Sequence, residues 1–198
     1  MKKGYFIALE GGEGTGKTTI ANLLKKEFKN TLVTREPGGL PVCEAIRNSI
    51  MQYNMDAKTE LLLFLAARQE HVKHKILPAI FDGKLVICDR FYLSTLAYQG
   101  YASELGIDKV RELNSFVCDY MPDVNIFIDL PPQIGLSRKN KEVNKLDLLG
   151  MEFHEKVYEG YKKLIQLKQD DIEVVDGTLS IEQVAEEICS IIKIRCEI

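Results

Sequence analysis

Short apolar runs alternate along the chain with longer segments in which apolar residues recur every three or four positions. The longer segments, such as the one carrying Ile181, Val184 and Ile188, have the period of amphipathic helices. The short runs, bounded by polar and turn residues, predict buried strands. The expected strands are Tyr5–Leu9, Thr31–Thr34, Leu85–Cys88, Val124–Leu130 and Ile172–Val175.

This alternation of strand and helix favours one kind of topology. Parallel strands are joined by right-handed crossovers, and these crossovers place helices on both faces of the sheet. We therefore expect a three-layer α/β fold with a mainly parallel five-stranded sheet, formed by a single domain over residues 1–198. No internal repeat and no low-complexity linker divides the sequence.

Composition and charge narrow the class of protein. Of the 198 residues, 45% are hydrophobic and 28% are charged, as in an ordinary globular domain. The net charge of -3 excludes a global basic excess of the kind that drives binding to nucleic acid, so any anion site must be local. No segment is long and apolar enough to cross a membrane, and Tyr5–Leu9 is too short for the apolar core of a signal peptide.

The cysteines indicate a compartment. They are odd in number, widely spaced and never arranged as C-x-x-C, so the pattern suggests neither a disulfide framework nor a zinc site. We expect a reducing cytoplasm, with the thiols of Cys43, Cys88, Cys118, Cys189 and Cys196 as small core or surface groups.

The strongest chemical signal follows the first expected strand. Residues 11–19 fit the pattern G-x-x-x-x-G-K-[ST] between a strand and a helix. The glycines let the backbone N–H groups wrap a polyphosphate, and the helix N-terminus adds a favourable dipole. Lys17 is expected to reach the β- and γ-phosphates, and Thr18 to ligate Mg²⁺. The predicted phosphate-binding residues are Gly11, Gly12, Glu13, Gly14, Thr15, Gly16, Lys17, Thr18 and Thr19.

A phosphate-binding loop does not reveal what is done with the triphosphate, because switches, ATPases and small-molecule kinases share it. Residues 144–147 match N-K-x-D, and residues 147–150 match D-x-x-G, which are both motifs of GTPases. In a GTPase the second motif comes well before the first, and each follows a buried strand. Here they overlap in reverse order inside a basic segment, so the GTPase interpretation is disfavoured.

The third expected strand leads into Asp89 and Arg90 at the carboxyl edge of the sheet, where open α/β folds build their sites. Asp89 can hold Mg²⁺ or its waters, and Arg90 can clamp a phosphate through two parallel N–H groups. A simple surface ion pair is the alternative interpretation. The second strand leads into Arg35, a further cation, and then into a turn that contains a proline and two glycines.

Four segments together resemble the bacterial type of the thymidylate kinase family, and the resemblance covers almost the whole chain. They are E-G-x-E-G-x-G-K-T at residues 10–18, T-R-E-P-G-G at 34–39, D-R-x-x-x-S at 89–94 and A-Y-Q-G at 97–100. The resemblance implies a P-loop nucleoside monophosphate kinase-like fold, transfer of the ATP γ-phosphate to dTMP, and a homodimer. A kinase for another nucleoside monophosphate and a nucleotide-dependent switch stay open as alternatives.

The same resemblance implies a set of acceptor contacts. Phe64 would stack on thymine, Arg68 would donate to its O4 atom, and Thr95 and Gln99 would complete the base edge. Taken without the family, Phe64 would be assigned to the hydrophobic core. The implied acceptor site comprises Glu13, Arg35, Arg47, Phe64, Arg68, Arg90, Ser94, Thr95, Tyr98 and Gln99.

The sugar and phosphate of the acceptor have contacts of their own in this scheme. Tyr98 would pack where a 2′-hydroxyl would sit, and Glu13 would approach the 3′-hydroxyl. Arg90, helped by Arg35 and Arg47, would hold the 5′-phosphate. Because that phosphate is already an anionic nucleophile, with a second pKa of about 6, catalysis is expected to consist of positioning and charge neutralisation.

Residues 138–145 form a basic segment, and the resemblance implies that it belongs to a lid over ATP at about residues 138–150. In the bacterial type the phosphate loop lacks a basic residue at its variable positions, as here with Thr15, so the resemblance implies that the lid supplies the charge. Adenine is expected between Arg138 and the loop at residues 176–178. The chain departs from the family pattern at Phe91, commonly Tyr, and at Lys145, commonly Arg. The predicted catalytic residues are Lys17, Asp89, Arg90, Arg138, Lys141 and Lys145, with Mg²⁺ on Thr18 and Asp89.

Overall fold

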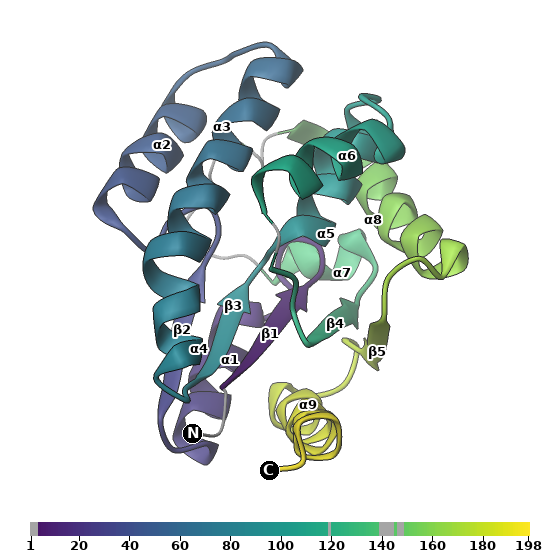
Figure 1. Ribbon diagram of the computed structural model, residues 1–198. Coiled ribbons are helices and arrows are strands. Elements are labelled where there is room, and N and C mark those ends of the chain that lie inside the picture. Colours follow the sequence, from purple (N-terminus) through teal and green to yellow (C-terminus); the bar gives the residue numbers. More distant parts are fainter. Residues whose placement is uncertain (1–3, 119, 139–144, 146–148) are drawn as a thin grey trace.

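The computed structural model describes residues 4–118, 120–138, 145 and 149–198, and its strands form one five-stranded sheet (Figure 1). All neighbouring strands are parallel, in the order β2-β3-β1-β4-β5. The predicted strands and three-layer fold are confirmed, and the sheet is wholly rather than mainly parallel. The strands are β1 (Tyr5–Glu10), β2 (Thr31–Arg35), β3 (Leu85–Asp89), β4 (Val124–Asp129) and β5 (Ile172–Asp176).

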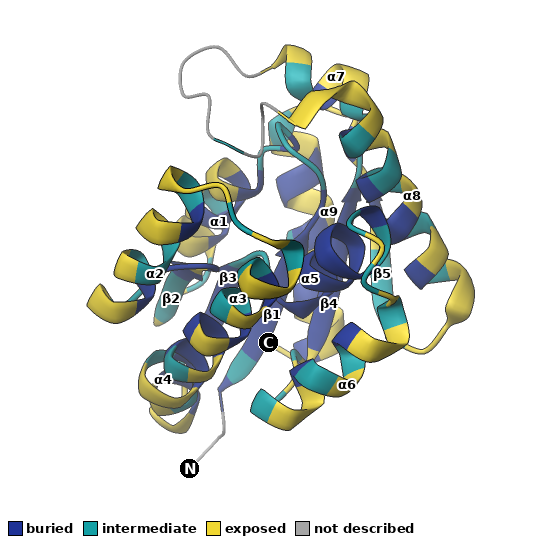
Figure 2. Ribbon diagram, turned by 90° about the horizontal axis from the view of Figure 1, so that it is seen from above, coloured by how far each residue is buried: buried dark blue, intermediate teal, exposed yellow. Residues whose placement is uncertain are grey.

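The central strand β1 shows how the sheet divides two cores. Its side chains alternate across the sheet, as those of any strand do. Ile7 and Leu9 belong to the hydrophobic cluster that includes residues of helices α1 (Lys17–Glu27) and α9 (Ile181–Cys196). Phe6 and Ala8 belong to the cluster on the opposite face. Both faces are therefore covered, and the buried strands lie between helices with exposed outer surfaces (Figure 2).

The remaining helices cover the second face or extend beyond the sheet. Helix α3 contributes Leu61 and Leu65 to the second core, α8 contributes Val157 and Leu164, and α2 packs on α3. Within the described residues no helix could span a membrane. These elements are α2 (Pro41–Gln52), α3 (Ala57–His71), the π-helical η1 (Val72–Ile76), α4 (Leu77–Phe81), α5 (Tyr92–Thr95), the π-helical η2 (Leu96–Ala102), α6 (Ile107–Val117), α7 (Pro132–Ser137) and α8 (Gly150–Leu167).

The parallel register brings the ends of the strands together. Leu9 of β1 lies opposite Asp89 of β3, and Arg35 of β2 lies opposite the same Asp89. Helix α3 carries Glu60, Phe64 and Arg68 four residues apart, so these side chains share one face of the helix. The carboxyl edge of the sheet and this face of α3 supply the functional site described next.

Candidate active site

The glycine-rich loop joins β1 to α1 and packs against α7. Gly14 and Gly16 have φ angles of 72° and 83°, in the left-handed region that glycine adopts without strain. A Cβ atom on Gly14 would lie 1.8 Å from the carbonyl oxygen of Gly135. Only glycine therefore fits at position 14, because the loop backbone approaches α7 so closely.

Lys17 is the first residue of α1, and its ammonium group turns back onto the loop. The Nζ atom donates to the carbonyl oxygens of Gly11 (3.2 Å) and Gly12 (2.7 Å) and to the hydroxyl of Thr15 (3.0 Å). Burial, aided by the positive charge of Arg90, lowers the pKa of Lys17 to about 8. The lysine is thus a buried cation whose partners in the loop are neutral.

Thr18 and Asp89 meet where α1 faces the end of β3. The Thr18 hydroxyl donates to Oδ2 of Asp89 at 2.5 Å. Hard oxygen donors of this kind suit Mg²⁺, which commonly takes one or two protein ligands and completes its shell with water and substrate phosphates. Within the described ranges no group of three or more His, Cys, Asp or Glu side chains could hold a metal ion. The pair fits a magnesium ion that phosphates help to bind.

Arg90 follows β3 directly and ties the strand end to the loop. Its φ angle is 69°, a strained value for a residue with a side chain, and its backbone N–H donates to the carbonyl of Leu9 at 2.9 Å. The guanidinium donates to the Gly11 carbonyl (2.7 Å) and to Glu13 (2.6 Å). It lies over the ring of Tyr98, 5.0 Å from the centroid. Arg90 is held beside the loop on several sides.

The buried carboxylate of Glu10 is connected to Arg90 through Ser94. Glu10, the last residue of β1, accepts from the N–H of Phe91 (2.9 Å) and from the hydroxyls of Ser94 (2.5 Å) and Tyr161 (3.1 Å). Burial raises the pKa of Glu10 despite these donors. The Ser94 hydroxyl also accepts a long 3.3 Å contact from Arg90. Ser94 thus links Glu10 to Arg90.

One cavity of about 590 Å³ joins these groups to the face of α3. That volume is within the usual range for a small-molecule site. The side chains predicted for the acceptor, all ten of them, line it together with Lys17, Thr18 and Asp89. Glu36, Pro37 and Met51 also line the cavity. Glu36 and Pro37 belong to the T-R-E-P-G-G motif, whereas no sequence pattern indicated Met51. The acceptor-site residues are Glu13, Arg35, Arg47, Phe64, Arg68, Arg90, Ser94, Thr95, Tyr98 and Gln99.

At the α3 end of the cavity, Arg68 is only 2% exposed and has a partner for every nitrogen. Its Nε donates to Glu36 (2.8 Å), one terminal nitrogen donates to Asn114 (2.6 Å), and the other donates to Thr95 (2.9 Å). The guanidinium also lies over the ring of Phe91, 4.9 Å from its centroid. Arg68 therefore has a fixed orientation.

Gln99 is held by a carboxylate on the same face of α3. Its Nε2 donates to Oε1 of Glu60 at 3.0 Å. The other oxygen of Glu60 accepts from Lys145 at 3.2 Å, and Lys145 also donates to the carbonyls of Ile50 (3.3 Å) and Tyr53 (3.0 Å) at the end of α2. Lys145 therefore binds near α2, and its contribution to transfer stays a prediction.

The other two lid residues are placed differently. Arg138 donates to the carbonyl of Gly177 at 3.2 Å, so it borders the loop where adenine is expected. Lys141 lies outside the described residues, as do residues 139–144 and 146–148 of the expected lid. The boundaries of the lid stay a prediction.

Two further arginines line the cavity, Arg35 and Arg47. Arg35 is about half exposed and pairs with Glu44 at 3.1 Å. Arg47 donates to the carbonyl of Pro37 at 3.2 Å. Both can turn toward an anion without breaking a buried ion pair.

A parallel sheet in this strand order, with a glycine-rich loop after its first strand and a cavity at its carboxyl edge, defines a P-loop nucleoside monophosphate kinase fold. The chain matches the family model for thymidylate kinase over residues 9–188. It is 45% identical to a thymidylate kinase from Clostridium novyi over 205 aligned positions, covering 98% of this chain and all of that one. The crystal structure of thymidylate kinase from Ehrlichia chaffeensis has a TM-score of 0.81 and 32% identity, covering 96% of this chain and 99% of that one.

A further relative, a thymidylate kinase from Shouchella clausii, is 44% identical over 196 aligned positions and covers 93% of this chain and 92% of its own length. The chain therefore belongs to the thymidylate kinase family, whose reaction is the phosphorylation of dTMP to dTDP by ATP. The resemblance drawn from the sequence motifs is confirmed.

Proposed function

We propose that this chain has the activity of its family, transfer of the γ-phosphoryl group of ATP to dTMP, and that transfer takes place in the cavity between the glycine-rich loop and α3. One observation carries the proposal. A single cavity has a phosphate-binding loop at one end and, at the other, an aromatic ring, a buried arginine and an amide on neighbouring elements. These three groups match the face, the keto oxygen and the edge of a pyrimidine base.

The base end suits thymine because its donors are fixed. A guanidinium carries five N–H groups, and Arg68 gives one from each nitrogen to Glu36, Asn114 and Thr95. Each terminal nitrogen keeps a second N–H beyond these described contacts, and Arg68 lines the cavity. Arg68 would donate to thymine O4 while Phe64 stacks on the ring. Thr95 and Gln99 would contact the edge of the base.

The sugar and phosphate would occupy the middle of the cavity. Tyr98 would pack against the deoxyribose and Glu13 would approach its 3′-hydroxyl. Arg90, with Arg35 and Arg47, would hold the 5′-phosphate. Each of these residues lines the cavity, and Tyr98 donates to Glu13 at 3.3 Å. Because the phosphate of dTMP is anionic at neutral pH, its attack on ATP needs no strong general base.

The donor would bind along the loop. Backbone N–H groups of residues 11–16 and the Lys17 ammonium would hold the phosphates of ATP, while Arg138 would border adenine. Thr18 and Asp89 would hold Mg²⁺, which neutralises charge on the β- and γ-phosphates when it is bound. The chain's own part is to orient donor and acceptor in line and to exclude water.

We extend the proposal to the lid, the assembly and the compartment. Residues 138–150 would form the lid of a single domain, with Arg138, Lys141 or Lys145 supplying its charge. Leu62 on α3 and Phe116 on the neighbouring α6 are 59% and 87% exposed, which supports a homodimer through these helices. The five cysteines are free thiols, which supports a cytoplasmic location.

The test is ADP release from Mg²⁺-ATP, first without an acceptor and then with dTMP, dUMP, dGMP, CMP or GMP. We expect fast turnover with dTMP and weaker turnover with dUMP, because one methyl group contributes about 1–3 kcal/mol in an apolar pocket. Preference for another monophosphate would overturn the assignment of the base pocket. Release that does not depend on an acceptor would indicate an ATPase or a switch.

A further inference from the structure

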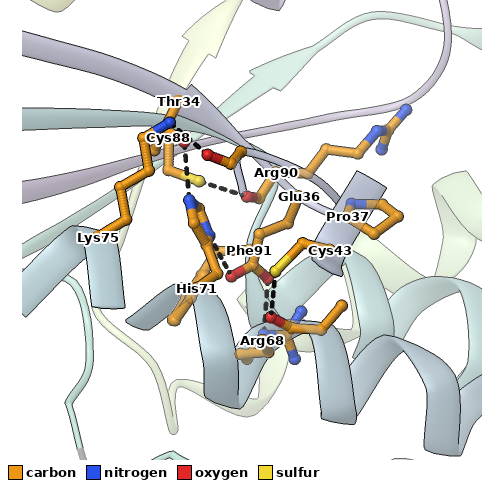
Figure 3. A network of polar contacts seen from close by, with 12 residues as sticks. Thr34, Glu36, Pro37, Cys43, Arg68, His71, Lys75, Cys88, Arg90 and Phe91 are labelled. Carbon is orange, nitrogen blue, oxygen red and sulfur yellow. Dashed lines mark hydrogen bonds and ion pairs between the residues drawn. The ribbon is translucent and has the colours of Figure 1, made fainter. Parts of the chain in front are cut away.

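A chain of buried polar side chains runs from Arg68 through Glu36 and His71 to Thr34 (Figure 3). Glu36 accepts from Nε of Arg68 at 2.8 Å through one oxygen, and its other oxygen contacts Nδ1 of His71 at 3.0 Å. Nε2 of His71 lies 2.7 Å from the hydroxyl of Thr34. His71 is fully buried and does not line the cavity. Because His71 does not reach the cavity, it would not contact a substrate bound there.

The ionisation state of Glu36 determines which atoms of this hydrogen-bonded series carry protons. Burial by itself raises the pKa of this carboxyl, but the charge of Arg68 and the hydrogen bond from His71 outweigh burial, so the pKa lies below its usual value. An ionised carboxylate only accepts hydrogen bonds, so Nδ1 of His71 must carry a proton. In a neutral ring, Nε2 then accepts from the Thr34 hydroxyl. Each polar atom in the chain has a complementary partner.

His71 and Arg68 contact the two oxygens of the same carboxylate, Glu36. The two basic residues lie three apart on α3, so they share one face of the helix and the carboxylate bridges them. An unrestrained carboxylate commonly binds arginine through two parallel hydrogen bonds, from Nε and a terminal nitrogen together. Here His71 holds the second oxygen of Glu36. With Oε1 turned toward His71, Glu36 meets Arg68 through Nε in the contacts described.

We propose that His71 is a positioning residue for recognition of the acceptor base. By holding Oε1 of Glu36, it keeps that carboxylate from capturing a terminal nitrogen of Arg68, and so leaves an N–H of Arg68 directed at the O4 atom of thymine. This inference rests on the proposed function, in which Arg68 contacts the base.

Two substitutions of His71 separate this role from simple packing. In His71→Asn the amide nitrogen occupies nearly the place of Nδ1 and can still donate to Glu36. In His71→Gln the amide reaches the place of Nε2, near Thr34, and the donor to Glu36 is lost. His74→Gln changes a half-exposed histidine of the adjoining η1 and serves as the matched control. Melting temperatures would show which variants are folded.

The measurements are KM for dTMP at saturating ATP, KM for ATP, kcat, and inhibition by dCMP. For His71→Gln we expect KM for dTMP to rise about tenfold, the size of one lost hydrogen bond, with KM for ATP and kcat within about twofold. Inhibition by dCMP should stay unchanged, because its amino group at C4 cannot accept from Arg68. His71→Asn and His74→Gln should stay within about threefold of the parent for dTMP.

Several results would overturn the inference. One is an unchanged KM for dTMP in folded His71→Gln, and another is equal impairment of the Gln and Asn variants. If His71→Gln does not fold, nitrogen-15 NMR of the unsubstituted protein tests the same point. A proton on Nδ1 supports the inference whatever the state of Nε2, and an unprotonated Nδ1 overturns it. Failure of the unsubstituted protein to use dTMP would instead reject the proposed function.

Discussion

The cations at the two ends of the cavity are held in different ways. At the phosphate end, Lys17 donates to the carbonyls of Gly11 and Gly12 and to a hydroxyl of its own loop. At the base end, Arg68 is held by Glu36, a buried carboxylate on a different element, and by an amide and a hydroxyl. Lys17 must give up contacts to reach a phosphate, whereas Arg68 can meet a base with its contacts intact.

This difference matches what each end would bind in the proposed function. Hydrogen bonds to a charged phosphate are roughly twice as strong as those to a neutral group, so a triphosphate can displace the neutral carbonyls from Lys17. A base offers only neutral oxygen and nitrogen atoms, and selectivity for it depends on donors that do not move. The phosphate end can therefore rearrange, while the base end gains from rigidity.

The largest expected effect comes from removing the phosphate-end cation. In Lys17→Ala we expect turnover to fall about a thousandfold, because a preorganised positive charge at the transferring group is lost. The affinity for dTMP, measured by calorimetry without ATP, should change less than about threefold, since Arg68 keeps its partners. Lys25→Ala, which changes an exposed lysine of the same helix, is the control. Near-normal turnover would contradict the assignment of the loop, and lost dTMP affinity would contradict the separation of the two ends.

A smaller effect is expected from pH. Lys17 is protonated below its pKa of about 8 and loses its charge as the pH rises through that value. Since kcat/KM reports the free enzyme, kcat/KM for ATP should be level up to pH about 8 and then fall about tenfold per pH unit. The affinity for dTMP should stay constant between pH about 7 and 9, because a guanidinium keeps its charge there. A level ATP profile up to pH about 9.5 would contradict the assigned role of Lys17.

The sequence alone was enough to predict most of the fold. The expected run Leu85–Cys88 became β3 with one residue added, and Val124–Leu130 became β4 with one residue removed. Strands of this kind are easily predicted because both faces of a parallel sheet are buried, which leaves short uninterrupted apolar runs. The glycine-rich loop was equally clear, since its spacing reflects a backbone conformation as well as its chemistry.

The residues that support the site could not be predicted in the same way. His71 contacts Thr34 and Glu36 across more than thirty positions of sequence, and in a helical pattern a histidine beside charged residues reads as part of an exposed face. Lys145 belonged to a charge run, and nothing in that run indicated its ion pair with Glu60. Local patterns specify strands and loops, whereas these pairs depend on how distant elements pack.

The smallest expected effect tests whether rigidity at the base end extends to Gln99. Because Glu60 can only accept, it fixes the amide nitrogen of Gln99 toward itself and turns the amide oxygen away. In Glu60→Gln, positions 60 and 99 both carry an amide. The nitrogen of either amide can donate to the oxygen of the other, so the orientation of Gln99 is no longer set.

We expect KM for dTMP to rise about threefold in Glu60→Gln. The values of kcat and KM for ATP should stay unchanged, because Lys145 keeps its hydrogen bonds to the carbonyls of Ile50 and Tyr53 when its ion pair with Glu60 is lost. Glu70→Gln, which changes a half-exposed acid on the same helix, is the matched control. An unchanged KM would mean that Gln99 needs no such support, whereas a loss of turnover approaching that of Lys17→Ala would mean that the two ends do not act separately. A threefold rise in KM for dTMP alone would mean that the carboxylates of Glu36 and Glu60, which accept from Arg68 and Gln99, keep the base end rigid.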